Sequence, residues 1–145
     1  MNTIEKITHW GDIHHPGWMD ILRMGLGGII FYKGLEFASN IEGLRATIES
    51  SGFILWTFLF AHYIILSHVM GGILIALGLI TRWAIIFQIP ILIGAVILNG
   101  KQSGLFDFYS QLWFSIIVLA LLIAFLVYGS GPFSVDEHMR KHPGG

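Results

Sequence analysis

Four long runs of apolar residues follow one another along the chain, with short polar stretches between them. The runs cover residues 18–37, 53–79, 83–98 and 108–128. A helix needs about 20 residues to cross the ~30 Å hydrocarbon core of a bilayer. The second and fourth runs reach that length by themselves, and membrane helices tolerate proline and glycine such as those inside the third. The pattern therefore predicts four transmembrane helices.

The connections between the runs predict how these helices are arranged. Residues 80–82 join the second run to the third, and so short a connection forces an antiparallel hairpin. The loops after the first and third runs then lie on the opposite side of the bilayer. We expect an all-α fold in which residues 18–128 form a single domain, an antiparallel four-helix transmembrane bundle. Residues 1–17 would form a cytoplasmic or interfacial segment, and residues 129–145 a cytoplasmic tail.

The distribution of lysine and arginine favours one orientation of this bundle. The side that holds both termini carries Lys6, Arg23, Arg82, Arg140 and Lys141, and the other side carries Lys33, Arg45 and Lys101. Cytoplasmic loops of membrane proteins carry an excess of positive charge. The count of five against three therefore predicts that both termini lie in the cytoplasm.

The loop after the first run has a periodic pattern of its own. Ile41, Leu44 and Ile48 recur at spacings of three and four, which is typical of one face of a helix. The charged residues that alternate with them are Glu42, Arg45 and Glu49. This loop is therefore predicted to form a short amphipathic helix at the membrane surface.

Composition supports a lipid environment and excludes several functions. Charged residues make up 12% of the chain, about half of the ~25% found in soluble domains, and the mean hydropathy is +0.72. The chain has no cysteine, which excludes disulfides and thiol-ligated metals. It has no basic cluster of the kind that binds nucleic acid. The lipid bilayer is thus the first expected partner, and any redox chemistry requires a bound cofactor or a partner subunit.

Two histidines in the middle of the second run raise the question of a metal site. His62 and His68 are six positions apart, which places them about 120° apart around a helix. Two histidines that share a metal on one helix need a spacing of three or four. His138 and His142 have that spacing, but they lie in a short polar tail of the kind that is usually solvated. No metal site is therefore predicted.

The face of the second run that carries His68 is rich in small residues. Gly72 lies four positions after His68, and Gly71 flanks it. Small residues at such spacings mark a close contact between membrane helices. We therefore expect His68 to face the bundle interior near the first helix. Gly71 and Gly72 should contact that helix near Gly27 or Gly28.

Three stretches resemble segments of the DoxX family, and they occur in the family's order. The stretch "ILRMGLGGIIFYKGLEF" is similar to its first helix, "HVMGGILIALGLITRW" to its second, and "GSGPFSVDEHM" to its ending. The residues that match by position are Arg23, Lys33, Gly71, Gly72 and Arg82. One residue departs from the family pattern, because many relatives carry a glutamate a few positions before the glycine pair, where this chain has His68.

The resemblance implies a small multi-pass protein of the bacterial inner (cytoplasmic) membrane. Some members are linked to thiosulfate:quinone oxidoreductases, to terminal quinol oxidases or to complexes that handle oxidative stress. This chain is accordingly expected to be an accessory subunit of a quinone-linked membrane oxidoreductase or respiratory complex, associated with partner membrane subunits or with copies of itself. The alternative is a non-catalytic scaffold or assembly protein with no cofactor of its own.

Ionisable groups inside the runs supply the candidate binding site. Arg23, Lys33, His62 and His68 are the residues expected to hold the head group of a quinone or lipid. A neutral imidazole both donates and accepts a hydrogen bond, which suits such a ligand. No covalent cofactor and no catalytic residue is predicted. In the competing structural interpretation, Arg23 pairs with Asp20, Lys33 pairs with Glu36, and each histidine bonds a nearby oxygen.

Overall fold

The computed structural model describes residues 2–3, 6, 17–50, 52–102, 111–128, 135–142 and 144. This part of the chain is helical and contains no strand, so the predicted all-α class is confirmed. Its elements are α2 (Trp18–Ser39), α3 (Ile41–Ser50), the 3-10 turn η1 (Ile54–Trp56), α4 (Thr57–Leu77), α5 (Thr81–Gln102), α6 (Gln111–Tyr128) and α7 (Val135–Lys141). The predictions for most of segment 1–17 and for the start of the fourth run fall outside the described residues.

The four long helices fall on the four predicted runs, but the hairpin turn comes earlier than expected. Helix α4 ends at Leu77 because Gly78 adopts a left-handed conformation with φ of 70°. The N–H of Leu79 then donates to the carbonyl of Leu74 at 2.9 Å, which closes a Schellman motif. The turn therefore begins two residues before the predicted connection at 80–82. A glycine that accepts φ above zero, rather than the polar residues after it, ends the helix.

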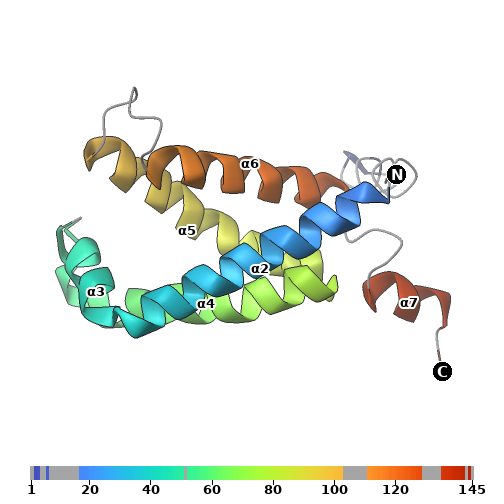
Figure 1. The fold of residues 1–145 in the computed structure, drawn as a ribbon, viewed down its shortest axis with the longest axis horizontal. Helices are drawn as coiled ribbons and strands as arrows, with labels where there is room; N and C mark the ends of the chain where they lie inside the picture. The colour runs from blue at the N-terminus through green and yellow to red at the C-terminus, as the bar shows by residue number, and fades with distance from the viewer. Residues whose placement is uncertain are drawn as a thin grey trace.

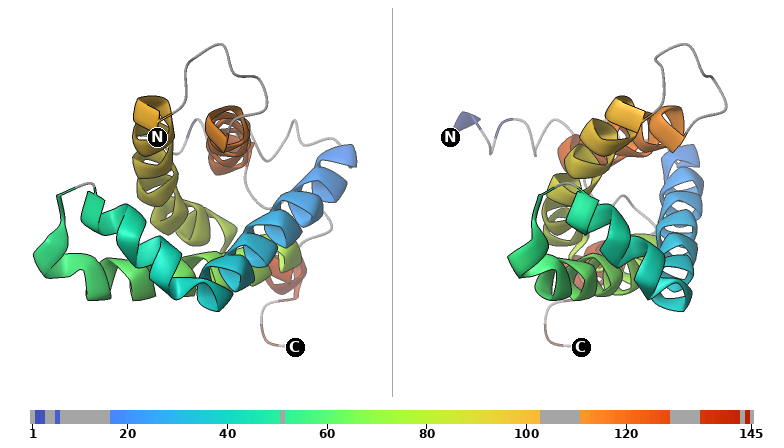
Figure 2. Two further views of the ribbon diagram at one scale, coloured as in Figure 1. Left: turned by 60° about the vertical axis from the view of Figure 1, so that its left-hand side comes forward. Right: turned by 90° about the vertical axis from the view of Figure 1, so that its left-hand side faces the viewer.

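The long helices pack as two pairs that diverge from a common end. Helix α2 lies along α4, and α6 lies along α5, while α4 and α5 contact each other next to the turn that joins them. Contacts between α2 and α6 are few. The distance between the α5–α6 pair and the α2–α4 pair therefore increases towards the end where α3 lies (Figure 1). Figure 2 shows the same arrangement from two other sides.

The short helix α3 forms where the sequence predicts an amphipathic helix. Ile48 is buried, Ile41 and Leu44 are half-buried, and Glu42 and Glu49 are exposed. Its apolar face therefore points towards the other helices, as the spacing of its apolar residues requires. Figure 1 shows α3 next to the end of α2 and the start of α4.

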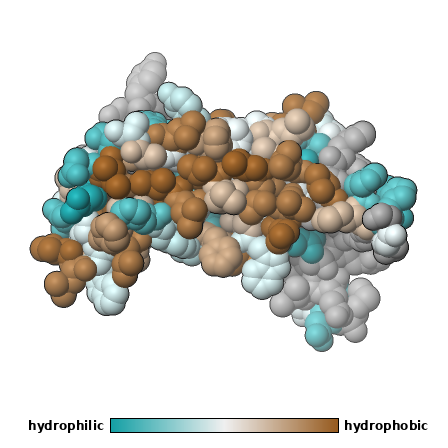
Figure 3. Space-filling model, turned by 90° about the horizontal axis from the view of Figure 1, so that it is seen from below, coloured by the Kyte–Doolittle hydropathy of each residue, from teal (hydrophilic) through white to brown (hydrophobic). Residues whose placement is uncertain are grey.

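The outer surface of the helices is strongly apolar. Large side chains are exposed along it, among them Ile21 at 73%, Leu55 at 94% and Leu66 at 63%. A space-filling view of one face shows a continuous apolar band along the molecule (Figure 3). Among the described residues, two helical stretches are long and apolar enough to cross a membrane, Ile54–Leu77 and Thr81–Leu98, each with a mean hydropathy of 1.9. Only 28% of each stretch is buried, which is unlike the core helix of a soluble domain.

Candidate functional site

Glycines bring the backbones of α2 and α4 into direct contact. A Cβ atom added at Gly72 would lie 2.8 Å from the carbonyl oxygen of Gly27, and one added at Gly27 would lie 2.6 Å from the carbonyl oxygen of Gly72. The predicted contact of Gly72 with Gly27 is therefore confirmed. The prediction for Gly71 is wrong, because a Cβ there would lie 3.3 Å from Oε1 of Gln88 on α5. Neighbouring residues on a helix point about 100° apart, so one glycine faces α2 and the next faces α5.

His68 lies beside this contact and faces α2, as predicted. The residue is buried, with an exposed fraction of 6%. A Cβ added at Gly34 would come within 2.9 Å of the His68 Cβ, so the absence of a side chain at Gly34 makes room for the histidine. The edge of the imidazole meets the ring of Phe37 at a centroid distance of 5.2 Å. Its Nδ1 donates to the carbonyl oxygen of Ile64 at 2.9 Å.

His62 lies on the outside of the same helix. Its Nδ1 donates to the carbonyl oxygen of Phe58 at 2.8 Å, the same bond to the preceding turn that His68 makes. Its ring lies against the Phe58 ring at 4.2 Å, and its side chain is exposed. The sequence left open whether this face meets lipid or the protein interior, and the structure places it on the outer surface.

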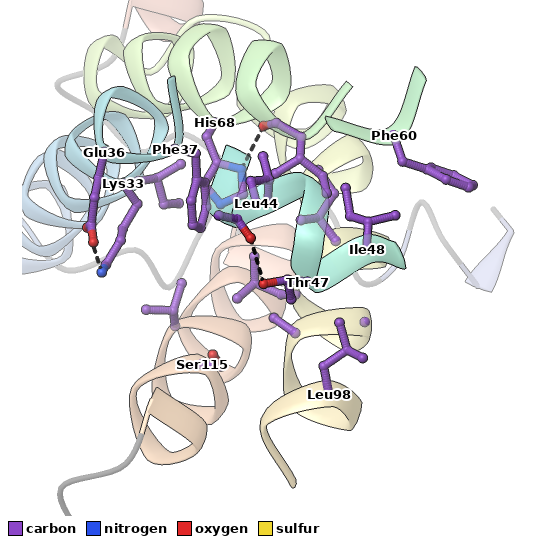
Figure 4. A pocket seen from close by; sticks show the side chains of 18 of the residues that line it. Lys33, Glu36, Phe37, Leu44, Thr47, Ile48, Phe60, His68, Leu98 and Ser115 are labelled. Atoms are coloured by element: carbon purple, nitrogen blue, oxygen red, sulfur yellow. Dashed lines mark hydrogen bonds and ion pairs between the residues drawn. The ribbon is translucent and has the colours of Figure 1, made fainter. Parts of the chain in front are cut away.

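A cavity of about 710 Å³ lies between the two helix pairs, at the end where they diverge. Ligand sites usually have volumes of about 300–1,000 Å³ and mostly apolar walls. Here the walls come from α2 to α6 and are largely aliphatic and aromatic. The polar side chains among them are Lys33, Glu36, Asn40, Thr47, His68 and Ser115. In Figure 4 the labelled side chains of α2, α3 and α4 lie along one side of the cavity, and Leu98 and Ser115 lie on the other.

Lys33 connects two walls of this cavity, α2 and α6. Its Nζ lies 2.8 Å from Oε2 of Glu36 one turn further along α2. The same ammonium lies 5.7 Å from the centre of the Phe114 ring on α6, a distance typical of a cation–π contact. The expected pairing of Lys33 with Glu36 is confirmed. Because only 22% of the lysine side chain is exposed, its charge is held at the cavity rather than in open solvent.

Arg23 takes part in a separate buried ion pair. Its Nη1 lies 2.9 Å from Oδ1 of Asp20, and the two side chains are 1% and 4% exposed. Within the described part of the chain, Arg23 Nε and Asp20 Oδ2 have no hydrogen-bond partner. Arg23 is ten residues from Lys33, which corresponds to roughly 15 Å along a helix. It therefore does not line the cavity.

The four residues expected to form one site are thus divided. Lys33 and His68 line the same cavity, whereas Arg23 lies in its own ion pair and His62 lies on the outer surface. The structural pairing of Arg23 with Asp20, the competing interpretation, is confirmed. Within the described ranges, no group of three or more histidine, aspartate or glutamate side chains is placed to hold a metal ion.

Comparison with known proteins identifies the family. The family model of DoxX matches residues 18–100, which is more than half of the chain. This chain belongs to the DoxX family. No curated protein and no solved structure matches it. The matched range of this DoxX protein contains α2 to α4 and most of α5, and therefore both Lys33 and His68, whereas Phe114 and Ser115 on α6 lie outside it.

Two polar side chains of this DoxX protein were missed by sequence reasoning. Gln88 is fully buried on α5, and both polar atoms of its side-chain amide lack a hydrogen-bond partner among the described residues. The Tyr63 hydroxyl donates to the carbonyl oxygen of Phe87 at 2.9 Å and so joins α4 to α5. That carbonyl lies in the turn before Pro90, whose ring has no N–H and disturbs the hydrogen bonding of that turn. The sequence signal was a lone amide in the third apolar run and a phenol next to His62 in the second.

Proposed function

We propose that this DoxX protein is an integral protein of the bacterial inner membrane in which α2, α4, α5 and α6 form an antiparallel four-helix bundle. Both termini then lie in the cytoplasm. The apolar outer surface supports this proposal, because a soluble protein rarely exposes so continuous an apolar area. Helix α2, with 22 residues, and α6, with 18, have lengths close to the ~20 residues that a span needs.

Reporter fusions test this topology. Fusions after Leu35 and after Gly104 should report an extracytoplasmic position, and a fusion after Thr81 should report a cytoplasmic one. The three together distinguish the proposed orientation from its inverse, because the inverse reverses all three results. A fusion pattern with Leu35 and Thr81 on the same side contradicts a spanning α4.

We further propose that the protein is an accessory subunit of a quinone-linked membrane oxidoreductase or respiratory complex. The cavity carries this proposal. Its apolar walls suit the body of a quinone or another lipid-like molecule, and His68 and Lys33 supply hydrogen bonding and charge for the head group. Its position between the helix pairs is a common one for ligand sites in helical bundles.

Purification from the native membrane in mild detergent tests the function. Mass spectrometry of co-purified proteins should find redox subunits, and solvent extraction should yield quinone in a fixed ratio to the protein. The variant Ala95→Phe fills part of the cavity and should lose the extracted quinone. Ala120→Phe is the matched control, because Ala120 is exposed on α6 and should change nothing.

The alternative function is a scaffold that assembles other membrane subunits and holds no ligand. The glycine contact between α2 and α4 favours it, since close packing of this kind makes a rigid support. If Ala95→Phe and the parent protein co-purify with the same partners and neither yields quinone, the scaffold is the better description. If the parent protein co-purifies with redox partners and Ala95→Phe does not, the ligand-binding subunit is the better description.

A further inference from the structure

The hydrogen bond of His68 to its own helix determines which ring nitrogen carries the proton when the imidazole is neutral. The Ile64 oxygen is a backbone carbonyl and can only accept, so Nδ1 of His68 must carry the hydrogen of this bond. In a neutral imidazole the other nitrogen, Nε2, then has a lone pair and no hydrogen. Nε2 is therefore a hydrogen-bond acceptor.

Among the residues that the structure describes, none donates to this acceptor. In the part of the chain that the structure describes, the only hydrogen bond of His68 is the one from Nδ1. The ring nevertheless lines the cavity, and Figure 4 shows it between Phe37 and Leu44, whose side chains offer no hydrogen-bond donor. A ligand in the cavity that brings a donor to this place therefore gains a hydrogen bond that the apolar walls do not supply.

We infer that the cavity selects an apolar molecule whose head group is a hydroxyl, and that this hydroxyl donates to Nε2 of His68. The inference rests on the proposed function of the cavity as a ligand site and adds the chemistry of the head group. A molecule that presents only a carbonyl or ether oxygen at this place brings a second acceptor to Nε2 and is disfavoured. Two sources offer the required chemistry, a reduced quinone with its two hydroxyls and a hydroxyl lipid such as diacylglycerol.

Binding measurements with matched probes test this preference. The purified protein in lipid nanodiscs is titrated, without oxygen, with a short-tailed hydroquinone, its dimethyl ether and the corresponding quinone. These three probes share one apolar body and differ in whether they can donate. We expect the hydroquinone to bind about tenfold more tightly than the other two, the ratio that one added hydrogen bond gives.

Two variants assign the preference to His68. His68→Leu removes the acceptor and should reduce the ratio between hydroquinone and dimethyl ether to about one. His62→Leu is the matched control, because His62 makes the same bond to its own helix but lies on the outer surface. It should keep the ratio of the parent protein. If His68→Leu still prefers hydroquinone over the dimethyl ether, the assignment of this preference to His68 is overturned. If that variant fails to fold, the titrations of the parent protein still test the preference itself.

The outcomes separate this inference from the proposed function. Quinone that binds as tightly as hydroquinone overturns the inference and leaves the quinone-linked function standing. Diacylglycerol is titrated in the same way as a fourth probe. If it binds while hydroquinone does not, the hydroxyl preference is supported and the quinone-linked function is overturned. If none of the probes binds, both are overturned.

Discussion

Replacing Gly72 tests the contact on which the α2–α4 pair depends. A Cβ at this position would lie 2.5 Å from the Phe31 nitrogen and 2.8 Å from the Gly27 oxygen, whereas ordinary contacts of a Cβ atom begin at 3.4 Å. The two backbones must therefore separate by nearly 1 Å at the closest point. Backbone atoms, unlike the end of a flexible side chain, cannot move aside independently, so the whole α2–α4 contact is loosened.

Two opposing effects decide the magnitude for Gly72→Ala. Forcing extra atoms into a packed contact costs about 1–3 kcal/mol. Alanine favours a helix over glycine by about 1 kcal/mol, which offsets part of that cost. Gly28→Ala is the matched control, since a Cβ at Gly28 meets nothing within 4 Å and only the helix preference remains. The difference between the two variants therefore isolates packing, at about 1–3 kcal/mol, and Gly72→Leu should fall at the upper end.

The free energy of unfolding can be measured by titrating the protein in detergent micelles with sodium dodecyl sulfate and following helical circular dichroism. Gly28→Ala should unfold at the same or a higher denaturant fraction than the parent protein, and Gly72→Ala at a lower one than Gly28→Ala. If Gly72→Leu is as stable as the parent, Gly72 does not lie at a close backbone contact and the geometry argued from Gly27 is wrong.

Three further substitutions test the other buried polar groups by the same unfolding assay. Arg23→Leu leaves Asp20 as an unpaired buried charge and should lower the free energy of unfolding by about 3–5 kcal/mol. The double variant Arg23→Leu/Asp20→Leu should recover most of this loss, and equal losses in the single and double variants would exclude a coupled pair. Gln88→Leu removes an amide that has no partner among the described residues and should stabilise the protein by about 1–3 kcal/mol, so a loss of stability would reveal a partner. Tyr63→Phe removes the hydrogen bond to Phe87 and should cost about 1 kcal/mol, and no change would mean that this bond forms no part of the α4–α5 contact.

Features that depend on neighbours within one helix could be predicted from the sequence. Apolar run length located the four long helices, and the spacing of Ile41, Leu44 and Ile48 predicted α3. The small residues one turn from His68 identified the face of α4 that is turned towards α2. A helix repeats every 3.6 residues, so the spacing of residues in the sequence already determines which of them share a face.

Features that depend on which helix covers a face were decided only by the tertiary structure. Gly71 meets α5 rather than α2, and His62 and Arg23 lie away from the cavity that contains Lys33 and His68. The cavity itself exists because the α5–α6 pair diverges from the α2–α4 pair, and its walls come from five helices. Angles between helices result from many contacts between residues far apart in the chain. Spacing along one helix contains no information about them, and for that reason the sequence predicted the candidate residues but not which of them share a site.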